Sequence, residues 1–408
     1  MAYRIYFERK PNGPIESRAK LCESLSITEE ELSKALALTE SQRYSEKTVP
    51  KADGTVRVIY NPHHLIRKIQ RRINSRFFNP KKFIHGYDAG LVRWPSYIFG
   101  CVPNEINDEG ELEEQKDYVA CARVHCPAKS ILKMDISDFY NNVHRDLVLN
   151  IFQHMLCFKD EEVSSILTDL CCMGDSLVQG GLTSSYLACL ALYDEEPKVV
   201  QRLKRKGFRY TRLIDDITIS SSKNNVNFDY VKDLIVKMLH SKDLPVNKEK
   251  TVVQYTSTEP LLVHGLRVNF KEPRLPKGEA SRIRANVHNV ERLAKERHYR
   301  TIHPYRRDFN KCMGRVNKLA RVGHKDYYKL YKRLQKVPPL PSKKDIERCE
   351  KALDGLEEKY KKGKNDTYWY WRRYNRASQR IAVIKRTFTH DAERLREKLR
   401  SLPYNYEQ

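Results

Sequence analysis

Two adjacent carboxylates, Asp215 and Asp216, stand inside an apolar stretch of β character, and they constrain the fold more than any other feature. Burying a carboxylate costs free energy unless it is paired, so an ordinary protein core has little reason to keep two of them. By itself, such a pair is typical of a solvated turn. However, the flanking residues are strand-forming, and a third carboxylate, Asp135, ends another apolar run about eighty residues earlier. The pattern therefore predicts three carboxylates at strand ends that act together.

Carboxylates in this arrangement indicate a divalent cation. Their oxygens suit Mg²⁺, which leaves coordination positions for water and for substrate phosphates. Two such ions can stabilise both the attacking 3′-oxygen and the leaving pyrophosphate of a nucleotidyl transfer. We therefore expect two Mg²⁺ ions, replaceable by Mn²⁺, on Asp135 and Asp215, with Asp216 as a weaker third ligand.

The region around the carboxylates alternates between strand and helix patterns, which is typical of an α+β core. The spacing predicts strands over 130–137, 209–221 and 261–270, and helices over 144–156, 183–196 and 228–241. Upstream, the sequence predicts helices over 20–47 and 64–78, a hairpin over 51–60 with its turn at Asp53-Gly54, and an exposed loop or insertion over 94–118.

Positive charge is concentrated in the last third of the chain. The 408 residues carry 76 Lys and Arg against 52 Asp and Glu, a net charge of +24. Residues 271–408 hold 38 basic and 17 acidic residues, whereas residues 1–270 hold 38 and 35. Solubility does not require such segregation, so we expect the last third to bind a nucleic acid. Its helical patterns are divided by a Pro-rich stretch over 336–342, which predicts a semi-rigid linker.

Composition excludes several classes of protein. Apolar residues make up 40% and charged residues 31%, which excludes wholesale disorder. No apolar run is long enough for a membrane span, and the N-terminal residues lack the apolar core of a secretory signal. The ten cysteines form no CxxC pair, so neither a disulfide framework nor a zinc knuckle is expected. Reduced thiols in a cytoplasmic protein are the simplest interpretation.

Six short motifs occur in an order that carries a family resemblance. The chain resembles bacterial reverse transcriptases of the retron and defence-associated kind, which are related to group II intron enzymes. Each string is weakly specific alone, but six in the right order are strong evidence. They are a fingers hairpin at 51–60 followed by His85-Gly86, motif A at 133–140, motif B at 178–185, motif C at 212–218, motif D at 246–251, and the primer-grip strand at 263–269.

This resemblance, over residues 50–290, implies a right-hand polymerase fold and the activity of an RNA-directed DNA polymerase. The implied domains are N-terminal helices and fingers over 1–128, a palm with an antiparallel sheet over 129–270, a helical thumb over 271–335, the linker over 336–342, and a basic, aromatic, helical extension over 343–408.

Three positions depart from the pattern of retron enzymes. Motif C usually has an aromatic residue two places before its Asp pair, where this chain has Leu213. The Asn of an Asn-Ala-x-x-His element is replaced by Cys121, with His125 at its end, and a Val-Thr-Gly element has His264 at its centre. The carboxylates are intact, so polymerase activity is still expected. The departures leave open whether the chain is a retron enzyme or belongs to a sister defence-associated lineage.

The resemblance also implies roles for residues around the catalytic aspartates. The carbonyl of Ile136 is implied to assist as a metal ligand. Gln179 and Gly180 are implied to approach the incoming nucleotide, where a glycine lets the backbone come close. Tyr140 matches the position of a bulky ring that crowds a ribose 2′-OH, which implies a preference for dNTPs. Packing of the Tyr140 ring in the core is the alternative.

Three cations are implied to act on the triphosphate. Lys51 and Arg57 flank the fingers hairpin and are implied to hold the triphosphate electrostatically. As exposed hairpin charges, they are equally well interpreted as solvated. Lys250 of motif D stands where this class often has a cation able to protonate the leaving pyrophosphate.

The basic last third is implied to hold the template–primer duplex and a structured RNA. Two arginines lie on a predicted thumb helix, and a glycine lies in the primer-grip strand. In the extension, aromatic residues interleave with arginines, which favours stacking on unpaired bases together with phosphate contacts. A helix that packs its aromatics on the thumb is the alternative. The residues concerned are Gly265, Arg282, Arg284, Trp369, Trp371, Arg372 and Arg373.

Two functions of different classes follow. The first is a reverse transcriptase that copies a dedicated noncoding RNA into cDNA in antiphage defence, with dNTPs, the RNA template or primer and the cDNA as partners. The second is a catalytically silent RNA-binding scaffold with a polymerase fold. Template-independent or protein-primed DNA synthesis stays open, as do a homo-oligomer and an effector partner protein. A group II intron maturase is disfavoured because no Cys- or His-rich tail follows residue 376.

Overall fold

The computed structural model describes residues 3–9, 13, 15–50, 54–79, 81–83, 86–88, 90–107 and 111–406. They form two compact units, Met1–Arg274 and Leu275–Gln408. The division falls close to the start of the thumb that the sequence predicts at residue 271. Strands occur in the first unit and helices in both, so the predicted α+β class is confirmed.

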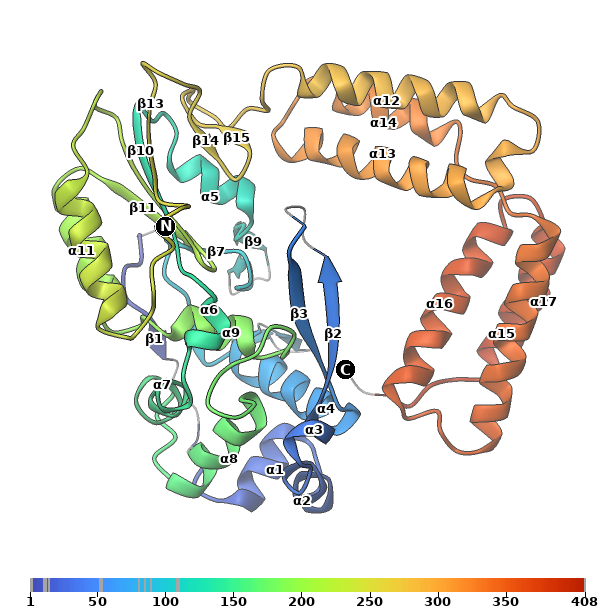
Figure 1. Ribbon diagram of the computed structural model, residues 1–408. Helices are drawn as coiled ribbons and strands as arrows, with labels where there is room; N and C mark the ends of the chain where they lie inside the picture. The colour runs from blue at the N-terminus through green and yellow to red at the C-terminus, as the bar shows by residue number, and fades with distance from the viewer. Residues whose placement is uncertain are drawn as a thin grey trace. The chain divides into compact units, whose positions relative to one another are not determined.

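A five-stranded sheet lies at the centre of the first unit (Figure 1). Its order is β13 (Val252–Tyr255), β10 (Ser130–Asp135), β12 (Asp216–Ser221), β11 (Arg209–Leu213) and β7 (Ile98–Phe99). Every pairing is antiparallel except that of β7 with β11. β10 is buried over almost its whole length, which explains why its sequence is a nearly continuous apolar run rather than an alternating one.

The segment 209–221 is two strands rather than one, so the sequence prediction is wrong here. β11 reverses directly into β12, with Leu213 opposite Asp216 and a two-residue turn between them. An apolar run with period two looks the same whether or not the chain reverses within it. At Ile214 the glycine or asparagine that usually marks a tight turn is missing, and the local turn signal of the Asp215-Asp216 pair was outweighed by its strand-forming neighbours.

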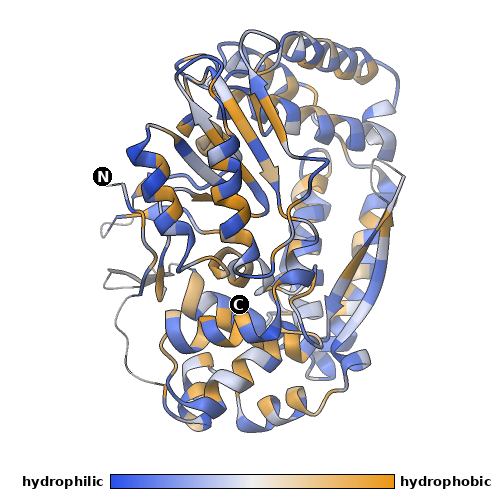
Figure 2. Cartoon of the chain, turned by 60° about the vertical axis from the view of Figure 1, so that its left-hand side comes forward, coloured by the Kyte–Doolittle hydropathy of each residue, from blue (hydrophilic) through white to orange (hydrophobic). Residues whose placement is uncertain are grey.

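Three predicted helical segments of this region are observed: 144–156 is α7 (Arg145–Asn150) with a π-helical turn (Ile151–Met155), 183–196 is the shorter α9 (Ser184–Leu190), and 228–241 is α11 (Asp229–His240). The sequence did not predict α5 (Tyr118–Val124), α6 (Phe139–Asn142), α8 (Glu161–Cys171) or α10 (Glu196–Arg205). Both α5 and α10 pack on β11, and α10 also packs against α11. Figure 2 shows largely hydrophobic strands beside helices that are hydrophobic on one side and hydrophilic on the other, the pattern expected for elements that share one core.

The N-terminal residues form short helices and a long hairpin. These elements are α1 (Arg18–Leu25), α2 (Glu29–Leu36), α3 (Glu40–Arg43), β2 (Tyr44–Pro50), β3 (Val56–Pro62), and α4 (His64–Ile73) with a π-helical turn (Asn74–Phe78). The segment predicted as helical over 20–47 forms three short helices rather than one, and the last of them ends at Arg43 because Tyr44 already pairs with Pro62 in the hairpin. The predicted hairpin is confirmed and is longer than the 51–60 expected, while Asp53 of its predicted turn lies outside the described residues. Smaller two-stranded sheets are β1 (Glu8–Arg9) with β6 (Val92–Arg93), β4 (Lys81–Phe83) with β5 (Gly86–Asp88), β8 (Glu105–Ile106) with β9 (Leu112–Glu114), and β14 (Leu262–Val263) with β15 (Leu266–Arg267).

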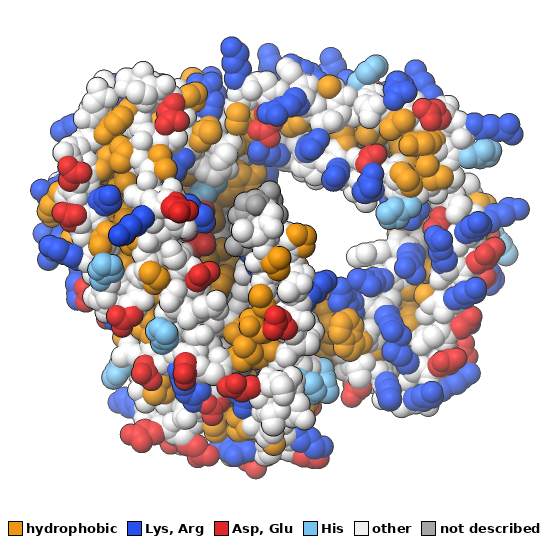
Figure 3. Space-filling model, viewed as in Figure 1, with side chains coloured by type: hydrophobic (Ala, Val, Ile, Leu, Met, Phe, Trp, Pro, Cys, Tyr) orange, Lys and Arg blue, Asp and Glu red, His pale blue; other side chains and the backbone are white. Residues whose placement is uncertain are grey.

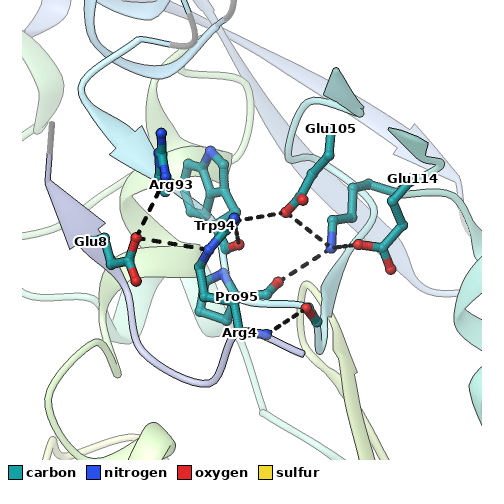
Figure 4. Close-up of polar contacts among 9 residues, drawn as sticks. Arg4, Glu8, Arg93, Trp94, Pro95, Glu105 and Glu114 are labelled. Atoms are coloured by element: carbon teal, nitrogen blue, oxygen red, sulfur yellow. Dashed lines mark hydrogen bonds and ion pairs between the residues drawn. The ribbon is translucent and has the colours of Figure 1, made fainter. Parts of the chain in front are cut away.

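The prediction of an exposed loop over 94–118 is wrong for the first part of this segment. β7 joins the central sheet, and Trp94 and Phe99 are buried. Arg4 connects the segment 94–118 to the N-terminal residues through hydrogen bonds (Figure 4). Its Nη1 donates to the carbonyl of Trp94 and to Glu105, each at 3.0 Å.

The acidic residues of the same segment are used to neutralise a buried lysine. Lys116 is almost completely buried. Its Nζ donates to Glu114 Oε2 at 2.8 Å and to the carbonyl of Pro95 at 3.3 Å. An acidic run normally indicates a solvated loop. Here the acidic residues pair with Lys116 of the same segment, and the composition alone does not reveal that this lysine is buried.

The second unit consists of two groups of three helices, and each group has a hydrophobic core of its own. The first group is α12 (Glu279–Ala294), α13 (His303–Arg321) and α14 (Tyr327–Gln335), with a 3-10 turn (Tyr299–Thr301); the second is α15 (Lys343–Lys361), α16 (Tyr368–Ile384) and α17 (Thr389–Arg400). Val287 and Val316 belong to the first core, and Leu353 and Ile381 to the second. Figure 3 shows many Lys and Arg side chains over these helices, as the segregation of charge in the sequence predicts.

The Pro-rich segment 336–342 is held by the helices that precede and follow it. The hydroxyl of Tyr305 donates to the carbonyl of Val337 at 2.6 Å. Arg386, which follows α16, donates to the carbonyl of Pro339 at 2.8 Å. The segment therefore joins the two helical groups through fixed contacts.

All ten cysteines are free thiols, and most of them are buried. Within the described ranges, no helix combines the length and the hydrophobicity that crossing a membrane requires.

Candidate active site

The three candidate catalytic aspartates lie together at one end of the central sheet. The β10–β12 register sets Asp135 directly opposite Asp216, and Asp215 occupies the turn that precedes β12. The N–H of Ile136 donates to the carbonyl of Asp215 at 3.2 Å, and the N–H of Asn247 donates to the carbonyl of Asp135 at 2.8 Å. These backbone contacts fix the relative positions of motifs A, C and D.

Burial and mutual repulsion make this carboxylate cluster unfavourable without a cation. Burial, with the negative charges of Asp215 and Asp135, raises the pKa of Asp216 to about 6. Burial and the charge of Asp135 also raise the pKa of Asp215, whereas the positive charges of Lys250 and Arg57 act in the opposite direction. Hard oxygen ligands that repel one another suit a divalent cation.

Lys250 neutralises part of this charge. Its Nζ lies 3.1 Å from Oδ1 and 3.0 Å from Oδ2 of Asp135, and this hydrogen bonding raises the pKa of the Lys250 ammonium. Its side chain is 63% exposed, so the ammonium can also be approached from solvent. Among the residues that the structure describes, no three Asp, Glu, His or Cys side chains converge closely enough to hold a metal ion outright. The donor set fits Mg²⁺ by its chemistry, and an ion there would share Asp135 with Lys250.

Two of the departures from the retron pattern meet beside Asp216. Cys121 Sγ lies 3.3 Å from His264 Nε2, and His264 Nδ1 lies 3.9 Å from a carboxylate oxygen of Asp216. Burial lowers the pKa of His264 to about 4, so the imidazole is neutral near pH 7 and this approach is not an ion pair. His125, from the same element as Cys121, is fully buried, with Nε2 2.8 Å from the hydroxyl of Thr211. The sequence marked each position as unusual but held no signal that they touch.

Motif B is joined to the fingers hairpin at Gly180. The N–H of Tyr60 in β3 donates to the carbonyl of Gln179 at 2.8 Å. Gly180 has a φ of +119°, and a Cβ at this position would lie 2.0 Å from the carbonyl oxygen of Tyr60. The close backbone approach expected at Gly180 is therefore made to the fingers strand. The contact of Gln179 and Gly180 with a nucleotide stays a prediction.

We expect Gly180→Ala to displace the fingers hairpin and to lower the rate of dNTP incorporation by about 10- to 100-fold, because a misplacement of about 1 Å is enough for such a loss. Gly207→Ala is the matched control, since Gly207 also has a positive φ, +78°, but faces open space where its Cβ would lie. Steady-state incorporation assays and melting temperatures measure both variants. Equal losses of activity would contradict a specific role for the contact with Tyr60.

Tyr140 lies in α6, beside the helix of motif B. Its hydroxyl is 3.2 Å from the hydroxyl of Ser185. Burial raises the pKa of Tyr140 to about 12, and the negative charge of Asp215 contributes to this shift. A partly buried ring within electrostatic range of the candidate catalytic residue Asp215 fits the implied contact with a ribose, and it also fits core packing.

Only one of the two hairpin cations can be placed. Lys51 lies outside the described residues, as does His85 of the predicted element that follows the hairpin. Arg57 is exposed on β3, and its charge acts on the carboxyl of Asp215. An exposed guanidinium within electrostatic range of the catalytic cluster suits the predicted contact with a triphosphate.

The segment 261–270 is a hairpin rather than the single strand that the sequence predicts, so that prediction is wrong. β14 and β15 are joined by His264 and Gly265, with φ values of +47° and +75°. Positive φ at both central residues is the type I′ pattern, which strongly favours glycine at the second of them. In the described part of the chain, no atom lies within 4 Å of a Cβ built at Gly265, so its positive φ rather than crowding favours glycine there. The contact of Gly265 with nucleic acid stays a prediction.

The two thumb arginines differ in their contacts. Arg284 Nη1 lies 2.6 Å from Asp326 Oδ2, and its Nη2 lies 2.8 Å from the hydroxyl of Ser281. This pair ties α12 to the start of α14, which is a structural role. Arg282 is exposed and has no ion-pair partner in the described part of the chain, so it is the better candidate for a contact with the duplex.

The aromatic residues at the start of α16 divide into a packed and an exposed group. Trp371 stacks on Tyr368, with ring centroids 5.7 Å apart and an interplanar angle of 27°, and it also lies 5.9 Å from Tyr406. Trp369 is 47% exposed, and the guanidinium of Arg372 lies 5.4 Å from the centre of its ring. Packing within the extension therefore accounts for Trp371, whereas Trp369 and Arg372 present a ring and a charge to solvent.

Comparison with known proteins identifies the family. A family model for reverse transcriptase (RNA-dependent DNA polymerase) matches residues 49–284. The Retron Ec48 reverse transcriptase of Escherichia coli is 44% identical over 395 residues, which cover 96% of this chain and 94% of that protein. The Retron Se72 reverse transcriptase of Salmonella heidelberg is 30% identical over 291 residues, 70% of this chain and 69% of that protein. Among solved structures, apo telomerase from Candida tropicalis matches with a TM-score of 0.40 and 11% identity, covering 81% of this chain and 67% of that one.

The matched region contains the carboxylate cluster and motifs A to D, so the order of motifs in the sequence was a sound guide. Both sequence relatives are retron enzymes, which answers the question that Leu213, Cys121 and His264 left open. The right-hand polymerase fold follows from the family. The chain belongs to the reverse transcriptase family and is an RNA-directed DNA polymerase of the retron type.

Proposed function

We propose that this enzyme copies a dedicated noncoding RNA into cDNA in antiphage defence, with Asp135, Asp215 and Asp216 as its catalytic centre. The observation that carries the proposal is the β10–β12 register, which sets Asp135 against Asp216 with Asp215 in the adjoining turn. A silent RNA-binding scaffold would have no use for this cluster, because gathering like charges in a partly buried place costs stability.

Two Mg²⁺ ions, or Mn²⁺, would be held by the three aspartates with the carbonyl of Ile136. When bound, such ions supply Lewis-acid stabilisation of the negative charge that develops during nucleotidyl transfer. Lys250, whose Nζ lies 3.0 Å from Asp135, would neutralise or protonate the pyrophosphate. Arg57 on the fingers hairpin would bind the triphosphate through charge-assisted hydrogen bonds.

Tyr140 would restrict the enzyme to dNTPs. Tyr140→Ala removes the ring that crowds a 2′-OH, so we expect the ratio of rNTP to dNTP incorporation to rise at least about tenfold, equivalent to about 1.4 kcal/mol of discrimination. Tyr140→Phe is the control, because it keeps the ring and loses only the contact with Ser185. Single-nucleotide incorporation with each substrate measures the ratio. An unchanged ratio in an active Tyr140→Ala variant would assign the ring to core packing.

The noncoding RNA would be recognised by α16. Trp369 stands at the start of this helix, and four arginines follow it, each three or four residues after an earlier member of the row, which places them along one side. They are Arg372, Arg373, Arg376 and Arg380. An exposed ring followed by a row of guanidinium groups suits a stacked base followed by phosphates.

The contacts of the extension leave this row of charges available. Arg394 of α17 pairs with Glu350 of α15 at 2.5 Å, so its charge holds helices together. By contrast, no acidic side chain in the described ranges is ion-paired with the four arginines of α16. At the far end of the row, Arg376 and Arg380 line a pocket together with Arg306 of α13 and Asp345 of α15, and Asp345 is paired with Arg306 at 3.4 Å. Charges that are not neutralised internally are free to release counterions from RNA.

Sequencing the nucleic acid that co-purifies with the protein, before and after RNase treatment, tests the proposal. We expect one RNA species and a cDNA complementary to part of it. Recovery of the RNA without cDNA would favour the scaffold. Recovery of DNA that matches no co-purified RNA would indicate template-independent synthesis.

A further inference from the structure

The turn that carries Asp215 is strained. Ile214 and Asp215 are its two central residues, and only Ile214 has a positive φ, +63°. This is the type II′ pattern, in which the first central position is normally glycine because a Cβ crowds the backbone there. Among the non-glycine residues with positive φ that the structure describes, Ile214 is the only β-branched one. Such a residue keeps this conformation only where its surroundings hold it.

Arg212 holds the carbonyl of Ile214. Its Nη1 donates to this carbonyl at 3.1 Å, and the Arg212 side chain is completely buried. Its Nη2 also donates to the carbonyl of Cys189 in α9 at 2.8 Å. The guanidinium therefore links the motif B helix to the motif C turn.

Glu196 fixes the guanidinium in turn. Its Oε1 lies 2.6 Å from Arg212 Nε and its Oε2 lies 2.7 Å from Arg212 Nη2, a bidentate pair with neither side chain exposed. The hydroxyl of Tyr210 donates to the same Oε1 at 2.7 Å. A buried ion pair is a poor source of stability, since apolar residues of similar volume often serve as well. The pair therefore suggests a role in placing the turn.

The ion pair of Arg212 and Glu196 does not affect catalysis through its charge, and it does not contact the substrate. The main charges that shift the pKa of the Asp215 carboxyl are those of Asp135, Lys250 and Arg57, and neither Arg212 nor Glu196 is among them. The pair of Arg212 and Glu196 is neutral as a whole, and its burial keeps it from any substrate. It acts on the backbone of the turn, and the position of this backbone determines where the two following carboxylates lie.

We propose that Arg212, held by Glu196, is a positioning residue for the polymerase reaction. It keeps the strained turn at Ile214 in the conformation that presents Asp215 and Asp216 to the metal ions. This role rests on the proposed catalytic function of those two aspartates.

Arg212→Lys tests the proposal, because lysine keeps the positive charge but has a single nitrogen in its head group. That nitrogen cannot bind both oxygens of Glu196 and also reach the carbonyl of Ile214. We expect the maximal single-turnover rate of dNTP incorporation to fall by about 10- to 100-fold, because the reacting groups are misplaced. The dNTP concentration at half-maximal rate should change little. Arg145→Lys is the matched control, since Arg145 pairs with Asp169 away from the motif C turn, and its rate should equal that of the parent.

The deciding comparison adds Ile214→Gly, because glycine adopts a positive φ without strain. If Arg212 acts by holding the turn, Arg212→Lys should cost at least about tenfold less rate in the Ile214→Gly background than in the parent. Equal losses in the two backgrounds would overturn the proposal, as would a parent-like rate for Arg212→Lys. Glu196→Gln should show the same coupling, and it replaces Arg212→Lys if urea unfolding shows that the latter does not fold. If neither folds, the pair is structural and the proposal fails.

Asp215→Asn with Asp216→Asn separates this proposal from the proposed catalytic site. Activity in that double variant would overturn both. An inactive double variant, together with no coupling between Arg212→Lys and Ile214→Gly, would overturn the positioning role alone.

Discussion

Asp215→Asn combined with Asp216→Asn is expected to lower dNTP incorporation by at least about 1,000-fold, because several kcal/mol of transition-state stabilisation depend on the cations that these carboxylates hold. The fold should survive. The pKa of both carboxyl groups is raised by burial, so the folded state disfavours their ionised forms. Neutral amides should therefore leave the melting temperature at pH 7 without Mg²⁺ unchanged or higher. RNA binding should be unchanged.

Primer extension in Mg²⁺, in Mn²⁺ and after addition of EDTA measures this effect. Asp194→Asn with Glu195→Gln is the matched control, an adjacent acidic pair of the same unit whose members pair with Lys242 and Lys198. This control should extend a primer at the parent rate. The same rate in the Asp215 and Asp216 variant, or activity that persists in EDTA, would show that the metal-site assignment is wrong.

Deletion of residues 343–408 is expected to separate RNA selection from chemistry. The candidate catalytic residues lie in the first unit, and α12 to α14 have their own hydrophobic core, so extension of an artificial primer–template should be largely retained. Affinity for the native RNA should fall by about 100-fold or more, since a stacked base contributes roughly 1–3 kcal/mol and each phosphate contact adds to it. Copying of that RNA, and defence, should fall with it.

Filter binding at several salt concentrations, run beside the generic extension assay, measures both properties. If the truncated protein binds the native RNA as tightly as the full chain, the extension is a packing element. If it loses activity on the artificial substrate, the boundary at the linker is misplaced. The contacts of Val337 and Pro339 with the helices on either side would then explain the loss.

Substitutions on the two sides of α16 distinguish residues that bind RNA from residues that pack within the extension, in the same assay. Trp369→Ala should weaken RNA binding by about 5- to 100-fold with little change in salt dependence, because stacking releases no counterions. Arg372→Ala with Arg373→Ala should reduce the salt slope by roughly one to two units. Trp371→Ala should instead lower the melting temperature, since its ring packs on Tyr368. Equal loss of affinity from both tryptophan variants, without loss of stability, would refute this division.

The grouping of the candidate catalytic aspartates could be predicted to a large extent, because charged residues within apolar strands can be recognised without a structure. Charged carboxylates at Asp135 and Asp215 are unexpected beside apolar strands, and such a conflict between residue type and local pattern indicates a functional site. The helices and the basic last third were also predictable, because helical period and charge can be counted along the chain. The prediction failed at 209–221, 261–270 and the first part of 94–118, where local pattern and tertiary contact disagree.

The failures at 209–221 and 94–118 share a physical cause, whereas at 261–270 Gly265 is a local signal of the turn and the prediction did not use it. A tight turn usually contains glycine or asparagine, which adopt a positive φ readily. Isoleucine does not, so Ile214 gives no sign of a turn, and its positive φ is maintained by the contact with Arg212. The acidic residues of 94–118 resemble a solvated loop until the buried Lys116 is found among them. In each case the deciding partner was in the sequence, but no local rule pointed to it.

The sequence by itself determined which residue types are available for chemistry, the α+β class and the location of the positive charge, because these depend on composition and on short periods. Only the tertiary structure decided which groups meet. Cys121 and His264 touch although 143 residues separate them, and the carbonyl of Tyr60 fills the space that the missing side chain of Gly180 leaves. Trp369 and Trp371 are chemically identical and two positions apart, yet one faces solvent and the other is packed. Burial, strain and pairing depend on neighbours in space, and the folded chain alone brings those neighbours together.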